Sequence, residues 1–398
     1  MTASHNRISD LPDVGSPEVL AWDPAPLDPD SLADALRPFG RSTMLPAAAY
    51  TSDAVLAWER RNLVAGTWAC LGRTEDLLGD SVTQRAVMAG DIQVLLTRDS
   101  ATGVSAALAN TCRHRGHELL PQDESATTSS IVCPYHAWSY RLDGSLRAAP
   151  GFRDNADFAE SEHGLVPLPL VEWHGWLFVN ATGTAVPFSE HIGALDELIA
   201  PYAPQTLVVA ARHTYEIAAN WKLVVENYHE CYHCPMIHPE LCQVSVPTSG
   251  DNFDLPGAWV GGTMNFKGDA VTMSLDGRSH GRPIPTAPQE TVLYAGMFPN
   301  LLVSGHPDYV MTHRMVPLAP DRTWVECSWL FPDADIDPSY AVDFWDITNR
   351  EDWGACESVQ RGLASPHFKP GPFAPSEDAV HQWVTMLARA YRGIAPHT

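Results

Sequence analysis

The chain has 398 residues, a length that predicts two domains rather than one compact unit. Hydrophobic residues make up 45% of it and charged residues 18%, as in globular proteins, and no apolar run approaches the ~20 residues that a membrane span needs. The formal charge of −23 argues against a nucleic-acid partner, because binding to phosphates needs a clustered basic patch. We therefore expect neither a membrane protein nor a nucleic-acid-binding one.

The N-terminus and the cysteines both favour a cytoplasmic location. Residues 1–7 are polar and lack the apolar segment of a secretory signal. Six of the eight cysteines lie outside the cluster motif described below, and their spacing is not that of a disulfide framework. These six are Cys70, Cys231, Cys234, Cys242, Cys327 and Cys356. We interpret Cys231 and Cys234 as small packing residues of a helix, since no second C-x-x-C segment follows that would complete a zinc site.

The first part of the chain predicts an arm and a small β domain. Residues 1–45 are rich in Pro, Asp and Ser and predict an N-terminal arm of low order, with one short helix near Ser31–Leu36. A helix is predicted over Asp53–Arg61. The rest of residues 46–165 alternates short apolar segments with turn residues, which indicates an antiparallel β domain. Its predicted strands are 68–72, 92–97, 105–109, 130–132 and 138–140.

Residues 166–398 predict a second domain of mixed character. The predicted strands are 173–180, 207–217, 292–303, 309–317 and 323–331. The predicted helices are 190–202, 221–234, 339–363 and 376–391, and a long loop follows the second of them up to residue 286. This order indicates helices packed against an antiparallel sheet. We therefore expect an α+β protein, with an antiparallel β domain followed by a sheet-and-helix domain.

Two short segments of the first domain each carry one cysteine and one histidine. Cys112-Arg-His114 and Cys133-Pro-Tyr-His136 form the order C-x-H, eighteen residues, C-x2-H. One iron of a Rieske [2Fe-2S] cluster takes two thiolates and the other takes two imidazoles, which is this ligand set. A structural zinc site is the alternative, but zinc fingers usually open with two cysteines and close with two histidines. The order therefore favours a Rieske cluster clamped between two loops.

A second group of polar residues lies on and after the predicted helix 221–234. Glu226, Glu230 and His233 recur at helical spacing and are expected to share one face. His238 follows five residues after His233, and a proline between them should end the helix, so that both imidazoles can turn toward one ion. Taken alone, two histidines at this spacing are usually ordinary surface or core residues, and an acidic helix face is often merely solvated.

Two histidines and one carboxylate on one face of a metal leave its other face open, an arrangement with which Fe(II) oxygenases work. The sequence must supply that carboxylate from another segment. We choose Asp352 on the predicted helix 339–363, although Glu351 and Glu357 lie on the same helix and spacing alone does not select among them. The second domain is therefore expected to hold a mononuclear iron.

Together, in this order and at this separation, the two motifs resemble the α subunit of a Rieske non-heme iron oxygenase, from about Tyr50 to the C-terminus. The resemblance implies a Rieske domain, a helix-grip catalytic domain, and a homotrimer in which the cluster of one subunit lies beside the iron of the next. It implies the cluster ligands Cys112, His114, Cys133 and His136 and the iron ligands His233, His238 and Asp352. It also places the family's bridging carboxylate, which links the metal sites across the subunit boundary, at Glu230, and the motif asparagine near the iron at Asn227.

Glu230 also bears on the substrate, because ring-hydroxylating members most often have Asp at this position. Together with segments 229–235 and 357–363, it makes the chain similar to members that oxidise quaternary ammonium compounds such as carnitine, glycine betaine and proline betaine. Such a cation forms no hydrogen bond and is held best over aromatic faces. Aromatic residues available for this are Trp259, Phe266, Tyr294, Phe298, Tyr309, Trp324 and Trp329, although strand aromatics are usually core residues. The alternatives are an aromatic ring or aryl-carboxylate oxygenase, and an electron-transfer Rieske protein without catalytic iron.

The implied reaction uses O2 and electrons from a separate reductase or ferredoxin to insert one oxygen atom into a C–H bond of a small-molecule substrate. The chain shows no flavin or nicotinamide fingerprint of the G-x-G-x-x-G type and no plant-type ferredoxin cysteine run. We therefore expect a separate electron donor. Hydroxylation of an N-methyl group would release formaldehyde.

Overall fold

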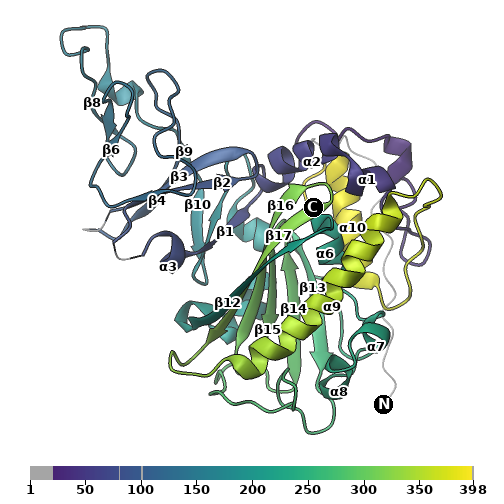
Figure 1. Cartoon of the computed structure of the whole chain (residues 1–398). Helices are drawn as coiled ribbons and strands as arrows, with labels where there is room; N and C mark the ends of the chain where they lie inside the picture. Colours follow the sequence, from purple (N-terminus) through teal and green to yellow (C-terminus); the bar gives the residue numbers. More distant parts are fainter. Residues whose placement is uncertain (1–20, 80, 100–101, 397–398) are drawn as a thin grey trace.

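The computed structural model describes residues 21–79, 81–99 and 102–396, and two β-rich parts lie at opposite ends of it (Figure 1). One part consists of small sheets and long loops, and the other is a large sheet surrounded by helices. The N-terminal helices α1 (Ala47–Thr51) and α2 (Asp53–Glu59) pack on the second part, and α2 continues as a π-helical turn over Arg60–Val64. The expected α+β class is confirmed.

The first part contains two antiparallel sheets. The five-stranded sheet has the order β5-β2-β3-β4-β9, and the three-stranded sheet has the order β6-β7-β8. Their strands are β2 (Gln84–Ala89), β3 (Ile92–Arg98), β4 (Ser105–Ala109), β5 (Ser125–Ala126), β6 (Ile131–Val132), β7 (Ser139–Tyr140), β8 (Leu146–Ala148) and β9 (Pro167–Leu168). A shared apolar cluster that includes Leu95, Leu108 and Trp138 holds the two sheets together. The loops after β4 and β6 are thereby brought side by side.

A third small sheet, of order β1-β11-β10, joins the two parts. It consists of β1 (Ala69–Arg73), β10 (Leu170–Trp173) and β11 (Trp176–Val179), and the short helix α3 (Thr74–Leu77) follows β1. The single strand predicted over 173–180 is wrong, because the chain reverses at His174 and Gly175, whose φ angles are 48° and 86°. Such left-handed angles suit a two-residue hairpin turn, which the apolar pattern on either side conceals.

The large sheet is antiparallel, with the order β12-β17-β16-β15-β14-β13. Its strands are β12 (Val208–Ile217), β13 (Trp259–Asn265), β14 (Thr291–Met297), β15 (Leu301–Gly305), β16 (Val310–Ala319) and β17 (Arg322–Phe331). The strand predicted over 292–303 is wrong, since it is a hairpin that turns between β14 and β15. The predicted long loop contains β13, whose adjacent Gly261 and Gly262 weaken the strand pattern.

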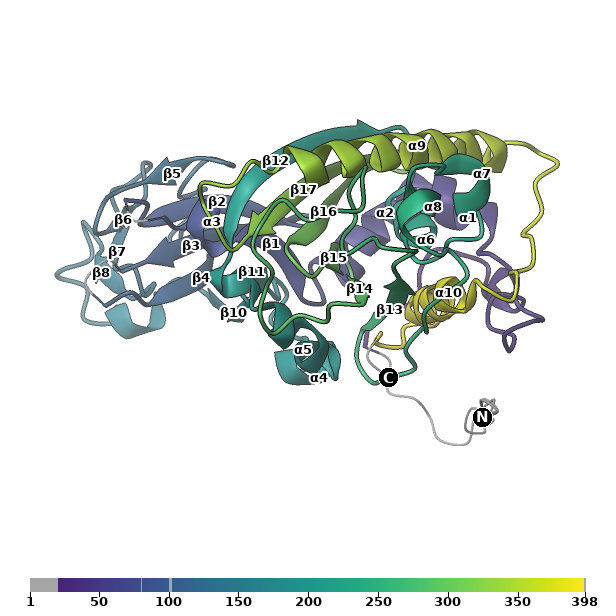
Figure 2. The ribbon, with the colours of Figure 1, turned by 90° about the horizontal axis from the view of Figure 1, so that it is seen from below.

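Helices cover this sheet and close one end of it. α9 (Ser339–Leu363) crosses one face, with the bounds that the sequence predicts (Figures 1 and 2). α10 (Asp378–Tyr391) packs beside α6 (Trp221–Tyr228), near β13. The largest apolar cluster lies between these helices and the sheet and includes Trp329, Phe344 and Trp383. The residues that follow α6 are therefore held against the edge of α9.

The motif helix is shorter than predicted. α6 ends at Tyr228 instead of Cys234, and the chain is helical again only in α7 (Cys234–Ile237) and α8 (Leu241–Val244). Glu230 explains the break, because its carboxylate accepts the backbone N–H of Tyr232 at 2.5 Å and of His233 at 3.3 Å. A side chain that binds backbone groups in this way competes with helix continuation. The expectation that Glu226, Glu230 and His233 share one helical face is therefore wrong.

The predicted helix 190–202 is also interrupted. It consists of α4 (Phe188–Ile192) and α5 (Leu195–Ile199), followed by a 3-10 turn over Ala200–Tyr202. Gly193 separates the two helices with a φ of 48°, and a Cβ at this position would lie 2.0 Å from the carbonyl oxygen of Pro256. A glycine is required by this close approach.

The described part of the N-terminal arm, residues 21–45, lies against the C-terminal helix. The indole Nε1 of Trp22 donates to the Ala390 carbonyl at 2.9 Å, and Leu32 and Leu45 are buried in the large apolar cluster. The expectation of low order is therefore wrong for these residues, and the predicted helix 31–36 is a 3-10 turn over Pro29–Leu32. Residues 1–20 lie outside the described part. No helix in the described ranges combines the length and apolar character that crossing a bilayer requires.

Candidate metal centres and cavity

The two predicted cluster cysteines lie at the tips of neighbouring loops. Cys112 follows β4, Cys133 follows β6, and each is 2% exposed. Each cysteine opens a tight turn, because the Gly116 N–H donates to the Cys112 carbonyl at 3.0 Å and the Ala137 N–H donates to the Cys133 carbonyl at 3.0 Å. The matching turns keep both thiols buried where the tips meet.

The two imidazoles lie nearer the surface. The ring centroids of His114 and His136 are 4.8 Å apart, and His136 is exposed. His114 is half-buried because its ring stacks on Trp138 at a centroid distance of 4.9 Å and an angle of 8°. Two sulfur donors thus lie inside and two nitrogen donors outside, which fits a cluster whose two irons have different ligands.

Tyr140 adds a hydrogen bond to this donor set. Its hydroxyl oxygen accepts the backbone N–H of Arg113 at 3.0 Å and lies 3.2 Å from Cys112 Sγ. Because that oxygen already accepts one bond, its O–H is available to donate to the sulfur. Hydrogen bonds to the sulfurs are among the factors that set the potential of such a cluster.

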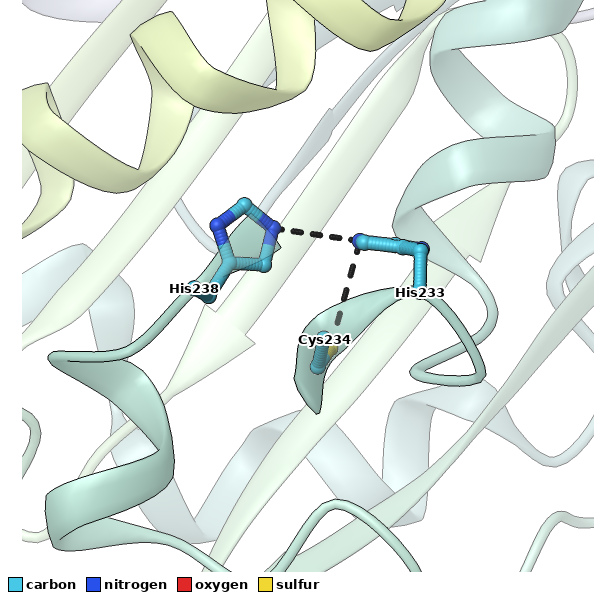
Figure 3. A group of neighbouring side chains, drawn as sticks. All are labelled: His233, Cys234 and His238. Carbon is cyan, nitrogen blue, oxygen red and sulfur yellow. Dashed lines mark hydrogen bonds between the residues drawn. The ribbon is translucent and has the colours of Figure 1, made fainter. Parts of the chain in front are cut away.

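Three donor atoms converge in the second part of the chain. Nε2 of His233 lies 3.1 Å from Nε2 of His238, and the two rings point toward each other in Figure 3. Oδ1 of Asp352 lies 2.8 Å from His238 Nε2 and 3.3 Å from His233 Nε2. His233 precedes α7, His238 follows it, and Asp352 comes from α9. Two imidazoles and one carboxylate on one side of a point are the donor set that suits Fe(II).

A second carboxylate holds each imidazole at its other nitrogen. Glu230 forms a short contact with His233 Nδ1, and Glu351 Oε2 accepts from His238 Nδ1 at 2.8 Å. A proton on each Nδ1 leaves the Nε2 lone pair for a metal. Burial lowers the pKa of His233, but Asp352 and Glu230 outweigh burial and raise that pKa to about 10. The two carboxylates thus favour positive charge at this point.

The same two histidines lower the pKa of Asp352. Burial acts in the opposite direction, but the hydrogen bonds from His233 and His238 prevail and keep the pKa of this carboxyl below its ordinary value. Asp352 is therefore ionised near neutral pH and offers a charged oxygen. The set of one anionic and two neutral donors fits a divalent iron.

Cys234 lies beside this centre but offers no thiolate. Its Sγ is 3.9 Å from His233 Nε2 (Figure 3), so these residues and His238 together resemble a metal site. However, Cys234 forms a disulfide with Cys231. Our interpretation of the two cysteines as packing residues is wrong, because the chain leaves the helix at Tyr228 and the loop brings their sulfurs together.

Two other acidic residues near the donor set, Glu226 and Glu357, bind groups away from the converging donors. Glu226 accepts a hydrogen bond from the buried Tyr50 hydroxyl at 2.8 Å, and Glu357 accepts the Ala218 N–H at 3.1 Å. Asn227 Nδ2 lies 3.5 Å from His233 Nε2, beside the converging donors, as the resemblance implies. Of the three carboxylates considered on α9, Asp352 is the one that reaches both Nε2 atoms.

A cavity of about 440 Å³ opens beside the converging donors. His233, His238 and Asp352 line it, together with the aromatic residues Tyr228, Tyr294, Trp345 and Trp353. The ring of Tyr294 lies 5.8 Å from that of Tyr228 and 6.5 Å from that of Trp345, measured between centroids. An aromatic chamber thus adjoins the histidines.

Away from His233 and His238, the cavity is lined by neutral imidazoles and by acidic residues. Burial lowers the pKa of His229 to about 3 and that of His313 to about 4, so both lining imidazoles stay neutral. Asp251 and Asp378 add carboxylates to the lining. Among the described residues that line the cavity, none is Lys or Arg. The chamber therefore favours a cationic group over an anionic one.

Sequence reasoning found few of these lining aromatics. Of the seven proposed, Tyr294 lines the cavity, whereas Phe298, Tyr309 and Trp329 are fully buried core residues. Tyr228, Trp345 and Trp353 were missed. The signal was present in α9, where Trp345, Thr348, Asn349, Asp352 and Trp353 follow the spacing of one helical face.

Comparison with known proteins identifies the family. Residues 67–159 match the Rieske [2Fe-2S] domain, and residues 204–393 match the ring hydroxylating alpha subunit (catalytic domain). The oxygenase subunit of glycine betaine monooxygenase from Chromohalobacter salexigens is 31% identical over 92% of this chain and 91% of its own length. The chain belongs to the Rieske oxygenase catalytic subunits. It is therefore an oxygenase that carries a Rieske [2Fe-2S] cluster and a mononuclear iron, and it works on a small molecule with a separate reductase.

Other Rieske oxygenases share smaller parts of the sequence or the fold alone. The oxygenase subunit of carnitine monooxygenase from Escherichia coli K12 is 36% identical over 49% of this chain and 52% of its own length. The crystal structure of the quaternary ammonium Rieske monooxygenase CntA superposes with a TM-score of 0.72 at 24% identity, over 94% of this chain and 99% of that one. Naphthalene 1,2-dioxygenase from Rhodococcus sp. has the same fold, with a TM-score of 0.70 at 18% identity and coverage of 92% and 98%.

Proposed function

We propose that this Rieske oxygenase hydroxylates a carbon bonded to the nitrogen of a small quaternary ammonium compound, such as an N-methyl group of a betaine. The names of its relatives support this, because glycine betaine and carnitine share a trimethylammonium group. The observation that carries the proposal is the aromatic cavity beside His233 and His238, which no described Lys or Arg lines. Aromatic faces hold an ammonium that forms no hydrogen bonds.

The proposal assigns a role to each predicted site residue. Cys112, His114, Cys133 and His136 hold the cluster, and His233, His238 and Asp352 hold the iron. Glu230 orients His233 and forms the bridge to the neighbouring cluster, while Asn227 lies next to the iron ligands. We also propose the division of the chain into the arm 1–45, the Rieske domain 46–165 and the catalytic domain 166–398.

We infer a homotrimer with subunits arranged head to tail. The loops around β6 lie at the opposite end of the chain from α7 in both views (Figures 1 and 2), so a path within one chain would be long. The loop after β4, beside the loop after β6, forms a tip that carries the exposed cations Arg113 and Arg115. Glu230 and Glu351 lie at the other end of the molecule. Such opposite charges favour docking of a neighbour's tip. Electrons reach that tip from a reductase or ferredoxin.

The chain's own residues fix the ligand histidines and position the substrate. When bound, the cluster supplies single electrons and the iron supplies O2 activation, which side chains cannot perform. Glu230 and Glu351 hold the Nδ1 protons of the two ligand histidines and fix their rings. Tyr294 and Trp345 hold the trimethylammonium group beside those rings. With two electrons and two protons, one atom of O2 enters a C–H bond and the other leaves as water, and the N-hydroxymethyl product releases formaldehyde.

A product assay tests the proposal. The iron-loaded protein is reduced without oxygen and then given O2 and one compound per tube, from betaines, carnitine and aromatic acids. We expect formaldehyde from a betaine and no product from an aromatic acid. The variant His233→Ala should keep the visible spectrum of the cluster and lose turnover, because one Nε2 donor is missing.

The control is His280→Ala, which changes an exposed histidine outside the cavity and should remain active. A phenol or diol from an aromatic acid would assign the protein to ring hydroxylation instead. Turnover that survives in His233→Ala would show that the iron site is wrongly placed.

A further inference from the structure

The disulfide between Cys231 and Cys234 encloses the proposed iron ligand His233. The Cα atoms of the two cysteines are 4.9 Å apart, which is within the range that a disulfide spans. Both residues line the cavity, and Cys231 is partly exposed. No other disulfide joins cysteines in the described ranges. This bond therefore belongs to the wall of the cavity that holds the converging donors.

The sulfur of Cys234 lies where it can join those donors. Cys234 Sγ is 3.9 Å from His233 Nε2, and the donor atoms of these two residues and His238 all lie within 4.8 Å of one another (Figure 3). Asp352 Oδ1 adds a fourth donor, 2.8 Å from His238 Nε2. Around a tetrahedral zinc ion, bonds of about 2.3 Å to sulfur and about 2.0 Å to nitrogen place such donors roughly 3.5 Å apart. The four atoms therefore match a zinc site once the sulfur is free.

The oxidation state of the two cysteines decides whether that sulfur is free. A metal binds a thiolate, and a disulfide offers none. With the bond closed, two nitrogens and one oxygen remain, which is the open set that suits Fe(II). With the bond open, Cys234 adds sulfur and completes a closed set of four, which suits zinc. The same point thus changes both the number and the type of its donors.

We propose that Cys231 and Cys234 form a reversible redox site that decides which metal the adjacent donors hold. The disulfide reserves the site for iron, and the dithiol admits zinc, which has no redox chemistry. This inference rests on the proposed iron site. Hydrogen peroxide closes the bond, because it takes two electrons and two protons from the thiols and becomes two water molecules. A small dithiol opens it by exchange, giving two electrons and two protons to the cysteines and becoming a disulfide itself.

Metal titration in the two redox states tests this proposal. Iron is first removed from the full-length protein with a chelator, and the visible spectrum confirms that the cluster remains. One sample then receives an equivalent of hydrogen peroxide, another receives dithiothreitol, and both are desalted without oxygen. Alkylation and mass spectrometry count the free thiols in segment 231–234, and calorimetry measures zinc binding. We expect the reduced sample to bind zinc about tenfold or more tightly than the oxidised one, because it has a fourth donor.

Two serine variants separate a free donor from a loosened loop. Both lack the disulfide, but Cys231→Ser keeps the Cys234 thiol, whereas Cys234→Ser removes it. We expect Cys231→Ser to bind zinc as tightly as the reduced wild type and Cys234→Ser to bind it as weakly as the oxidised wild type. Cys242→Ser changes a cysteine that does not line the cavity and should respond to both reagents as the wild type does.

Three results would overturn the inference. They are equal zinc affinity in the two redox states, equal affinity in the two serine variants, and thiols in segment 231–234 that stay free after peroxide. Formaldehyde from a betaine with the iron-loaded wild type upholds the proposed function in each of these cases. No product from any compound, with zinc affinity that still follows the redox state, would contradict the proposed substrate class and support the redox site.

Discussion

Glu351 is a carboxylate that positions one of the proposed iron ligands, His238. It accepts from His238 Nδ1 at 2.8 Å and directs the opposite nitrogen toward Asp352 and His233. A carboxylate in this position fixes the tautomer and makes the imidazole a stronger ligand. The next residue, Asp352, is rotated by about 100° around the axis of α9 relative to Glu351. Glu351 therefore reaches Nδ1 of His238, and Asp352 reaches Nε2.

We expect Glu351→Gln to weaken iron binding by about 10- to 100-fold, because loss of such a partner usually costs that much in metal affinity. Titration of the iron-loaded protein with a ferrous chelator measures this, while the visible spectrum of the cluster should not change. Glu357→Gln is the matched control on the same helix, since Glu357 binds the Ala218 N–H and not a ligand histidine. Equal iron loss in both variants would contradict the role of Glu351.

At the scale of elements, α6 is tied to the N-terminal helix α1 by polar contacts inside the core. The Tyr50 hydroxyl donates to Glu226, and Asn220 Nδ2 donates to the Tyr50 carbonyl at 3.1 Å. Lys222 of the same helix is fully buried and paired with Glu59 at 2.7 Å. These contacts position the end of α6, from which the loop to His233 begins.

Glu226 makes this junction sensitive to pH. Burial raises the pKa of its carboxyl to about 7, above the ordinary 4.5, so the native state favours the protonated form. Its contribution to stability is therefore complete below pH 4.5 and is lost as the pH rises through 7. We expect Glu226→Gln to be more stable than wild type at pH 8, by on the order of 3 kcal/mol, and nearly equal at pH 4.5.

Thermal or urea unfolding at the two pH values measures the difference. Glu190→Gln, which changes an exposed residue of α4, serves as the control and should shift neither value. A stability difference for Glu226→Gln that is the same at both pH values would refute the assignment of this titration to Glu226.

At the scale of the whole molecule, the separation of the two proposed metal-binding ends supports the proposed contact with a neighbouring subunit. The loops around β6 project away from the large sheet, while α7, which His233 precedes and His238 follows, lies at the far end (Figure 1). A ring of three head-to-tail subunits would bring each tip to the next subunit's proposed iron site, since heterologous contacts form a ring when the rotation between subunits closes.

Mixed assemblies test this arrangement. Cys112→Ser removes a proposed cluster ligand and His233→Ala removes a proposed iron ligand, so each variant alone should be inactive. Co-expressed in equal amounts, they should recover about a quarter of the wild-type activity, because a subunit with intact iron then follows one with an intact cluster. The mass of each assembly in solution is the control for trimer formation. No recovery in mixed trimers would indicate electron transfer within one chain.

The sequence by itself determined whatever depends on short spacing. The cluster motif lies within two loops, and the apolar period of α9 predicts its bounds from Ser339 to Leu363. The family follows from the same local patterns, because ligand types and their order reflect the chemistry of the metals they bind. The hairpins of β10 with β11 and β14 with β15 were missed, since the apolar pattern continues through each tight turn.

The tertiary structure alone decided which groups meet. Asp352 reaches His238 across 114 positions of the chain, and the choice between Asp352 and Glu351 depends on how α9 is rotated against the loop after α6. The unpartnered Tyr294 hydroxyl and the Cys231–Cys234 disulfide likewise result from long-range packing and from the early end of α6. Periodicity reports which face of an element is apolar, whereas the neighbours of each side chain depend on how separate elements pack, and no local pattern encodes that.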